Sequence, residues 1–244
     1  MACTFSPRKL QERNLFIKLR LNTLSACLFA TSALLGASAP AFAADAPSLG
    51  SASNYTFLST EAETRGAVTC TDASIVGDIG SSGFPAAVVQ TGCARVGGIT
   101  APVSARVLAD SNNAYDALQT ARCERILTGT LANVILPPGV YCFDEAAALT
   151  GTLTLAGPPT GVWTFLVNGD LTGNIFTTLM AGGGQACNVY WGPTGAATMT
   201  DSNFKGTILA GAATTLTRGT FIGRAFAKNA VTLTGVAATG CDRL

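Results

Sequence analysis

The chain has 244 residues, of which only 12% are charged, and its 15 lysines and arginines nearly balance its 14 aspartates and glutamates. This composition gives no basic stripe of the kind that binds nucleic acid or an anionic membrane surface. Histidine is absent, which excludes Ser-His-Asp and Cys-His catalytic sites and histidine metal ligands. The chain is long enough to form one hydrophobic core.

Residues 1–43 are typical of a secretory signal peptide. Basic residues precede an apolar run, Leu21 to Leu35, and the small-x-small tripeptide Ala41-Phe42-Ala43 follows it. We expect cleavage after Ala43, because the apolar run is shorter than the roughly 20 residues that a membrane-spanning helix needs. The alternative is a lipoprotein site at Leu24-Ser25-Ala26-Cys27, although no proper apolar segment precedes that cysteine.

Removal of this signal defines the mature protein as a single domain, residues 44–244. It leaves 10 basic and 13 acidic residues, a net charge of −3. We expect bacterial-type export of a protein with no integral membrane segment. Its destination is the extracellular medium, with the periplasm or the cell surface as alternatives.

Six cysteines remain in the mature chain, and an even number in an exported protein is typical of disulfides. A zinc site is the competing interpretation, but the sequence contains neither a Cys-x-x-Cys pair nor a histidine. Sequence alone leaves the pairing open. Our working hypothesis, in which the last pair ties the final coil to the rest, is Cys70–Cys93, Cys123–Cys142 and Cys187–Cys241.

The C-terminal stretch Ala197–Gly240 repeats itself every 17 residues. Thr-x-Thr motifs recur at this spacing, and between them Phe204–Ala210 aligns with Phe221–Ala227. A period too short for a βαβ unit predicts solenoid coils that stack on one another. In each motif the middle residue points inward and both threonines point outward. The candidate surface threonines are Thr198, Thr200, Thr215, Thr217, Thr232 and Thr234, joined by Thr152 and Thr154 from a motif outside the 17-residue spacing.

The remainder of the mature chain is predicted to lead into this stack, cap it and brace it. Residues 81–103 break the regular pattern and predict an irregular insertion that caps one open end of the solenoid. Residues 104–127 predict a helix, with Ser104 as N-cap and an apolar stripe that packs along the solenoid. Short strands are predicted within Leu49–Leu58, Ala67–Thr71, Ser74–Val76, Leu136–Tyr141, Thr150–Leu155, Val162–Val167 and Cys187–Trp191.

Several segments of the mature chain together carry a family pattern. They are Leu49-Gly50, Tyr55–Leu58, Gly77–Gly80, Leu136–Tyr141, Thr150–Gly157, Trp163–Val167, Gln185–Trp191, Gly206–Ala210, Gly223–Ala227 and Ala230–Thr234. Across roughly residues 49–239 the chain resembles the microbial family of secreted ice-binding (antifreeze) proteins. The resemblance implies a mainly β fold: a right-handed, discontinuous β-solenoid of triangular cross-section, with interleaved terminal coils and one long α-helix alongside. It also implies adsorption to ice through one flat face, without catalysis.

Three functions remain as hypotheses. The first is an ice-binding protein, acting as a monomer on the ice crystal surface with no cofactor or metal. Threonines suit this role, because each offers a methyl and a hydroxyl group on a rigid grid, although Thr-x-Thr is also ordinary strand sequence. The second is an adhesion or spacer module of the cell surface or matrix. The third is a carbohydrate-active enzyme, for which the carboxylate pairs Glu61/Glu63 and Asp144/Glu145 form no clustered acidic ladder.

Overall fold

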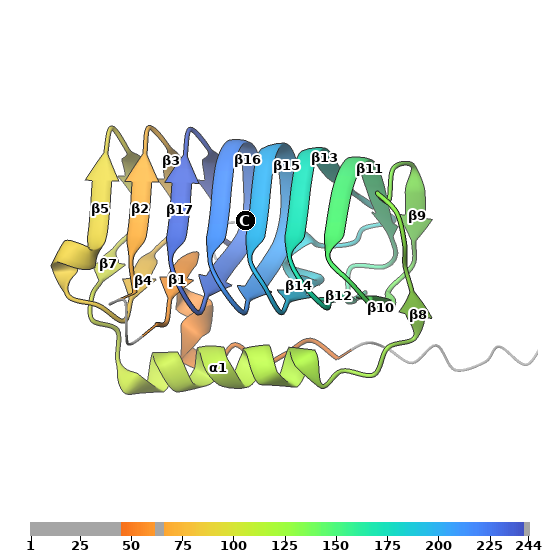
Figure 1. Cartoon of the computed structure of the whole chain (residues 1–244), viewed down its shortest axis with the longest axis horizontal. Helices are drawn as coiled ribbons and strands as arrows, with labels where there is room; N and C mark the ends of the chain where they lie inside the picture. The colour runs from red at the N-terminus through yellow and green to blue at the C-terminus, as the bar shows by residue number, and fades with distance from the viewer. Residues whose placement is uncertain (1–44, 62–65, 242–244) are drawn as a thin grey trace, which may run out of the picture. The chain divides into compact units, whose positions relative to one another are not determined.

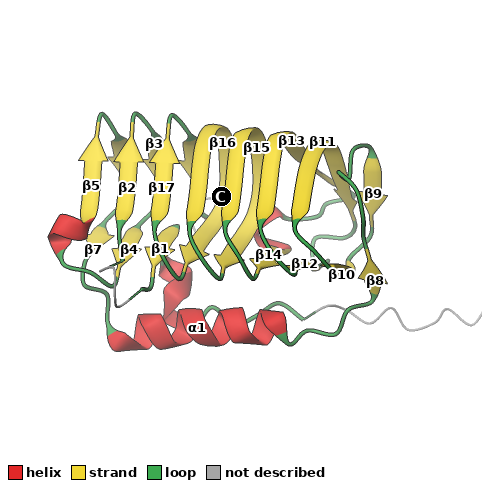
Figure 2. Ribbon diagram, viewed as in Figure 1, coloured by secondary structure: helices red, strands yellow, loops and turns green. Residues whose placement is uncertain are grey.

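The structure is a computed structural model that describes residues 45–61 and 66–241, so the predicted signal peptide lies outside it. These residues form a mainly β fold with one α-helix, in which all neighbouring strands run parallel (Figures 1 and 2). No helix in this part of the chain is long and apolar enough to cross a membrane. The helix is α1 (Ala105–Gln119), and the strands are β1 (Phe57–Ser59), β2 (Val68–Thr71), β3 (Ser74–Val76), β4 (Ile79–Ser81), β5 (Val88–Thr91), β6 (Ala94–Val96), β7 (Ile99–Thr100), β8 (Arg125–Ile126), β9 (Val134–Leu136), β10 (Gly139–Phe143), β11 (Ala147–Ala156), β12 (Trp163–Val167), β13 (Leu171–Ala181), β14 (Val189–Pro193), β15 (Ala197–Ala210), β16 (Thr214–Ala227), β17 (Val231–Thr234) and β18 (Ala237–Thr239).

The strands form stacked coils whose spatial order differs from their order in the chain. At one end, the coil β5–β6–β7 pairs with β2–β3–β4. The next coil is composite, because the C-terminal strands β17 and β18 and the N-terminal strand β1 lie between β2–β3–β4 and β16. Beyond β16 follow β15, then β13 with β14, then β11 with β12, and finally β9 with β10 (Figure 1). The interleaving of terminal coils that the family resemblance implies is therefore confirmed.

Each coil contributes to three faces. The threonine face contains β5, β2, β17 and the first parts of β16, β15, β13 and β11. The second face contains β6, β3, β18, the middle of β16 and β15, and the later parts of β13 and β11. The helix face contains β7, β4, β1, the ends of β16 and β15, and then β14, β12 and β10.

Helix α1 covers the helix face. Its residues Val107, Ala114 and Leu118 pack in one buried cluster with Leu209 and Phe226 from the ends of β15 and β16. Ser104 is the N-cap, as expected, and its Oγ accepts a hydrogen bond from the Val107 N–H. The helix does not cover the threonine face. In Figure 1, α1 runs below the stack, and the strands of the threonine face lie in front, toward the viewer.

The interior is a column of stacked aromatic rings. Phe204 lies 6.0 Å from Phe221 and 5.3 Å from Trp191, and Trp191 lies 3.9 Å from Phe165, measured between ring centroids. These side chains are at most 1% exposed. Such dense packing fixes the spacing of the coils and makes each face a rigid surface.

Three disulfides brace the stack, and they join the same pairs as our working hypothesis. Cys70–Cys93 ties the terminal coil to its neighbour, and Cys123–Cys142 ties the segment after α1 to β10. Cys187–Cys241 ties the last described residue to the middle of the stack. All six cysteines that the structure describes are thus joined in disulfides, which leaves none of them as a zinc ligand.

The range 81–103 is not the irregular insertion that the sequence predicts. It contains β5, β6 and β7, which form a regular coil at the end of the stack. The polar residues Gln90 and Arg95 face Cys70 and Ile75 of the next coil and break the apolar alternation. Polar side chains are tolerated at these inward positions because a terminal coil has a neighbouring coil on one side only, so its inward side chains are not fully buried.

The helix is also shorter than the predicted range 104–127. It ends at Gln119, and Arg125 and Ile126 form strand β8, paired with Tyr141 and Cys142. The Cys123–Cys142 disulfide holds this segment against β10. Tertiary contacts therefore override the helical pattern after residue 119.

Candidate functional site

The centre of the threonine face carries eight threonines in two columns. Each of four neighbouring strands, β15, β16, β17 and β2, contributes a Thr-x-Thr motif, and the register of strand pairing places the motifs directly beside one another. Figure 1 shows these strands side by side. We call this set the threonine array; its columns are Thr198, Thr215, Thr232, Thr69 and Thr200, Thr217, Thr234, Thr71.

The array points outward because the residue between each pair of threonines is buried. Met199, Leu216, Leu233 and Cys70 are at most 2% exposed, whereas all eight threonines are half-buried. Parallel strands lie about 4.8 Å apart, and residues i and i+2 lie about 6.6 Å apart along a strand. The backbone therefore fixes a two-dimensional grid of methyl and hydroxyl groups.

The array contains no charged side chain. Within the part of the chain that the structure describes, none of the eight hydroxyls is hydrogen-bonded to another protein group, so their hydrogen bonds are available to water. Two of the charges next to the array, Asp201 and Arg218, pair at the adjoining edge through two hydrogen bonds of 2.6 Å. The hydrogen bonds from Arg218 lower the pKa of the Asp201 carboxyl. These two charges thus largely offset each other.

The face continues beyond the array on both sides. On β13, Thr172 and Asn174 lie beside Thr198 and Thr200, and both are exposed. On the other side, strand β5 places Val89 and Thr91 beside the β2 threonines, and both are likewise exposed. The array therefore occupies the four central strands of a wider face, with β13 and β5 directly beside it.

A left-handed corner ends each strand of the face. The residues that follow the second column all have a positive φ, between 49° and 66°. A turn of this kind redirects the chain onto the second face, and it favours glycine, asparagine and aspartate. The corner residues, in spatial order from β5, are Gly92, Asp72, Gly235, Arg218, Asp201 and Ile175.

Six of the eight sequence-predicted threonines lie together in the array, but Thr152 and Thr154 do not. They pair with Thr177 and Leu179 of β13, on the second face. The reason is the position of the corner: Gly151, with φ 70°, precedes Thr152, whereas in β15 the corner residue Asp201 follows Thr200. The same Thr-x-Thr motif therefore appears on the opposite side of the turn.

Sequence reasoning missed Thr69 and Thr71, which complete the array. Their motif, Thr69-Cys70-Thr71, lies outside the C-terminal repeat, and its middle residue is a cysteine rather than an aliphatic side chain. The signal that identifies it is the residue after the motif. Asp72 has φ 49°, as Asp201 does after Thr200, so Thr-x-Thr followed by a corner residue marks this face.

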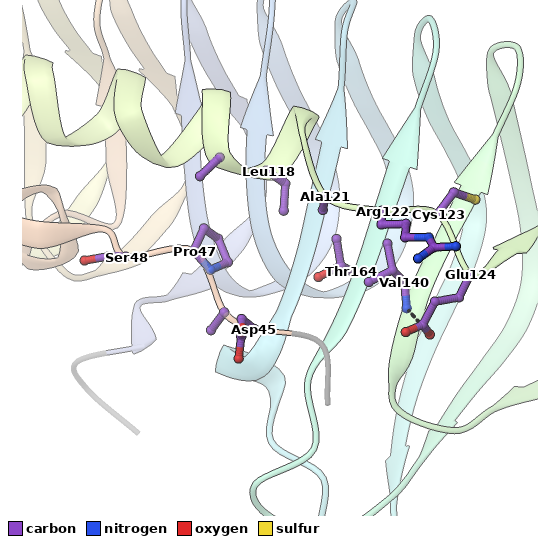
Figure 3. A pocket seen from close by; sticks show the side chains of 12 residues that line it. Asp45, Pro47, Ser48, Leu118, Ala121, Arg122, Cys123, Glu124, Val140 and Thr164 are labelled. Atoms are coloured by element: carbon purple, nitrogen blue, oxygen red, sulfur yellow. Dashed lines mark hydrogen bonds between the residues drawn. The ribbon is translucent and has the colours of Figure 1, made fainter. Parts of the chain in front are cut away.

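One pocket lies on the helix side of the molecule, away from the threonine face and the second face. It measures about 770 Å³ and lies between the end of α1 and the segment from Asp45 to Ser48 (Figure 3). Of its two acidic residues, Asp45 and Glu124, the latter already accepts a 3.1 Å hydrogen bond from the Val140 N–H. Among the described residues there is no group of three or more His, Cys, Asp or Glu side chains placed to hold a metal ion. The array, rather than this cavity, is therefore the candidate site.

A parallel β-solenoid braced by one helix, with one flat and uncharged threonine face, defines the structural class. The chain belongs to the ice-binding-like family, whose model matches residues 57–239. The family expected from the sequence is thereby confirmed.

Individual relatives agree in sequence and in fold. The chain is 34% identical over 224 residues to a protein of Nostoc sp. (strain HG1) described as an ice-binding protein, covering 88% of this chain and 82% of the relative. The DUF3494 domain of Shewanella frigidimarina ice-binding protein 1 superposes with a TM-score of 0.70 at 26% identity, covering 81% of this chain and 98% of that domain. The ice-binding protein of the Antarctic ascomycete Antarctomyces psychrotrophicus gives a TM-score of 0.69 at 29% identity, with coverage of 81% and 98%.

Proposed function

We propose that this protein is a secreted ice-binding protein that adsorbs to ice through the threonine array and thereby inhibits ice growth and recrystallisation. The observation that carries the proposal is the array itself: eight outward threonines in two columns on four adjacent strands. Membership of the ice-binding-like family and the similarity to proteins described as ice-binding support it.

Adsorption of this kind depends on rigidity. A single methyl or hydroxyl contact with ordered water is weak, so many contacts must form together. The array sits on a packed core and loses little conformational entropy when it is covered, so its contacts can sum. The absence of charge from the array also helps, because no ion on it has to lose its hydration shell when ice replaces liquid water.

Export of the protein is part of the proposal. Three disulfides fit an oxidising compartment, and the sequence of residues 1–43 fits a signal peptide that is removed. We propose that the mature chain acts outside the cytoplasm as a monomer, without a cofactor and without catalysis.

An ice recrystallisation assay with the purified mature protein tests the function. The native protein is expected to keep ice grains small during annealing, whereas the same preparation after heating with a reductant is expected to let them coarsen. Grain growth at the buffer rate with a folded, disulfide-bonded sample would refute the proposed function.

A further inference from the structure

Ile175 is an exception among the corner residues beside the threonine face. It lies in β13 directly after Asn174, and its φ is 51°, in the left-handed region. Its side chain is 70% exposed. A β-branched residue in this conformation is a genuine outlier, because its Cβ substituents crowd the backbone.

The other corner residues either suit the left-handed turn or gain a partner in it. Gly92 and Gly235 carry no Cβ, and Asp72 and Asp201 are of a type that tolerates this conformation. Arg218 pairs with Asp201 at 2.6 Å. Ile175 has no polar group with which to form such a pair, and its exposure means that little packing offsets the strain. Neither the backbone nor the core explains an isoleucine there.

Strain retained at one exposed position is typical of a functional residue. Ile175 lies at the margin of the face, since the preceding residue, Asn174, pairs with Thr200 at the end of the second column. We propose that Ile175 is an ice-contacting residue that widens the threonine face onto its corner. The inference rests on the proposed function. An apolar side chain suits this place because, unlike the carboxylates of Asp72 and Asp201 in equivalent corners, it has no ionic hydration shell to lose.

The test compares three variants in a dilution series for recrystallisation inhibition. Ile175→Asn removes the apolar side chain and relieves the strain, Ile175→Leu keeps an apolar side chain, and Asp72→Asn is the matched control at another corner. If ice covers about 50 Å² of the isoleucine, Ile175→Asn should raise the minimum inhibitory concentration about five- to tenfold. It should also raise the melting temperature by about 2–4 °C, since asparagine accepts the left-handed turn. Ile175→Leu should inhibit as the wild type does, and Asp72→Asn, which removes a charge from its corner, should inhibit at least as well as the wild type.

The combination of higher stability and weaker inhibition separates a surface role from a structural one. An active wild type whose Ile175→Asn variant inhibits equally well would overturn the role of Ile175 and leave the proposed function intact. An Ile175→Leu variant as weak as Ile175→Asn would also overturn it, because the apolar character would then not matter. An inactive wild type would instead overturn the proposed function on which the inference rests.

Discussion

The substitution Thr215→Tyr places an obstacle inside the threonine array. Thr215 is flanked by Thr198 and Thr232 in its column and by Thr217 along its strand. Tyrosine has good strand propensity, and the position is half-buried on an outer face, so the free energy of unfolding should change by no more than about 0.5 kcal/mol. The phenol ring, however, would stand above the plane of the methyl groups and hold their neighbours away from a flat crystal.

The expected loss follows from the size of the array. A fully buried methylene contributes about 0.8 kcal/mol, so a half-exposed threonine methyl that becomes covered contributes about 0.4 kcal/mol. Eight such groups give about 3 kcal/mol, if their contributions add. Loss of most of this energy corresponds to roughly a hundredfold weaker adsorption. A single substitution should therefore remove most of the activity.

Recrystallisation inhibition, measured beside circular dichroism and thermal melting, checks this prediction. The matched control is Thr220→Tyr. The sequence suggests a turn at Thr220, but the residue lies in β16 on the second face. Its side chain is exposed, and its hydroxyl donates a 2.8 Å hydrogen bond to Asn203 Oδ1. The control should keep full activity. If Thr215→Tyr inhibits fully with unchanged melting, or if Thr220→Tyr alone is inactive, the assignment of the threonine face is refuted.

Three further predictions concern the disulfides, pH and processing. Mass analysis without reductant should find no alkylatable thiol among the six mature cysteines, and two or more free thiols would contradict the pairing. The Cys187–Cys241 bond joins residues 54 apart in the sequence, so opening it should lower the free energy of unfolding, measured in urea, by about 4 kcal/mol. Inhibition should stay constant from about pH 6 to 9, because the array has no ionisable group, and the melting temperature should also stay constant there, because the chain contains no histidine. Arg218 lowers the pKa of Asp201 in the folded protein. The Asp201 carboxylate therefore stabilises the fold at a pH above its unfolded pKa of about 3.9, and this stabilisation is lost as the pH falls through the lower folded pKa. A midpoint near pH 7 in the plot of inhibition or of melting temperature against pH would contradict this prediction. The intact mass of secreted material should correspond to a chain that begins at Ala44, and a mass that retains Met1 would refute signal cleavage.

The C-terminal coils were predictable because each is long and each repeats its neighbour. Strands β15 and β16 pair along nearly their full length, Phe204 opposite Phe221 and Gly206 opposite Gly223, as their 17-residue spacing predicts. Inward apolar and outward polar positions alternate on the threonine face, and the corner interrupts the alternation at the same place in both strands, at Asp201 and Arg218. The three disulfide pairs were only a working hypothesis, because cysteine spacing carries no geometric information about contacts between coils.

The terminal coil was not predictable by the same reasoning. Strands β6 and β7 contain three and two residues, too few for an alternating pattern to be recognised. Arg95 occupies an inward position of that coil, opposite Ile75. At the end of a stack the inside is only partly buried, so the rule that inward residues are apolar fails there.

The assignment of threonines to faces depended on the corners, which the motif alone does not show. The turn lies after Thr200 in β15 but before Thr152 in β11, at Gly151. A shift of this kind moves a whole motif from one face to the next. It cannot be read from alternation, because the pattern within each strand is the same on both faces.

A competitive ice-partition experiment tests most directly whether the threonine array holds this protein to ice. Wild-type protein and the Thr215→Tyr variant, distinguishable by mass, are mixed in equal amounts while ice grows slowly on a cold probe in the solution. We expect the wild type to be enriched in the ice fraction and the variant to be excluded from it, as an ordinary solute is. Equal enrichment of both proteins, or exclusion of both, would contradict the account.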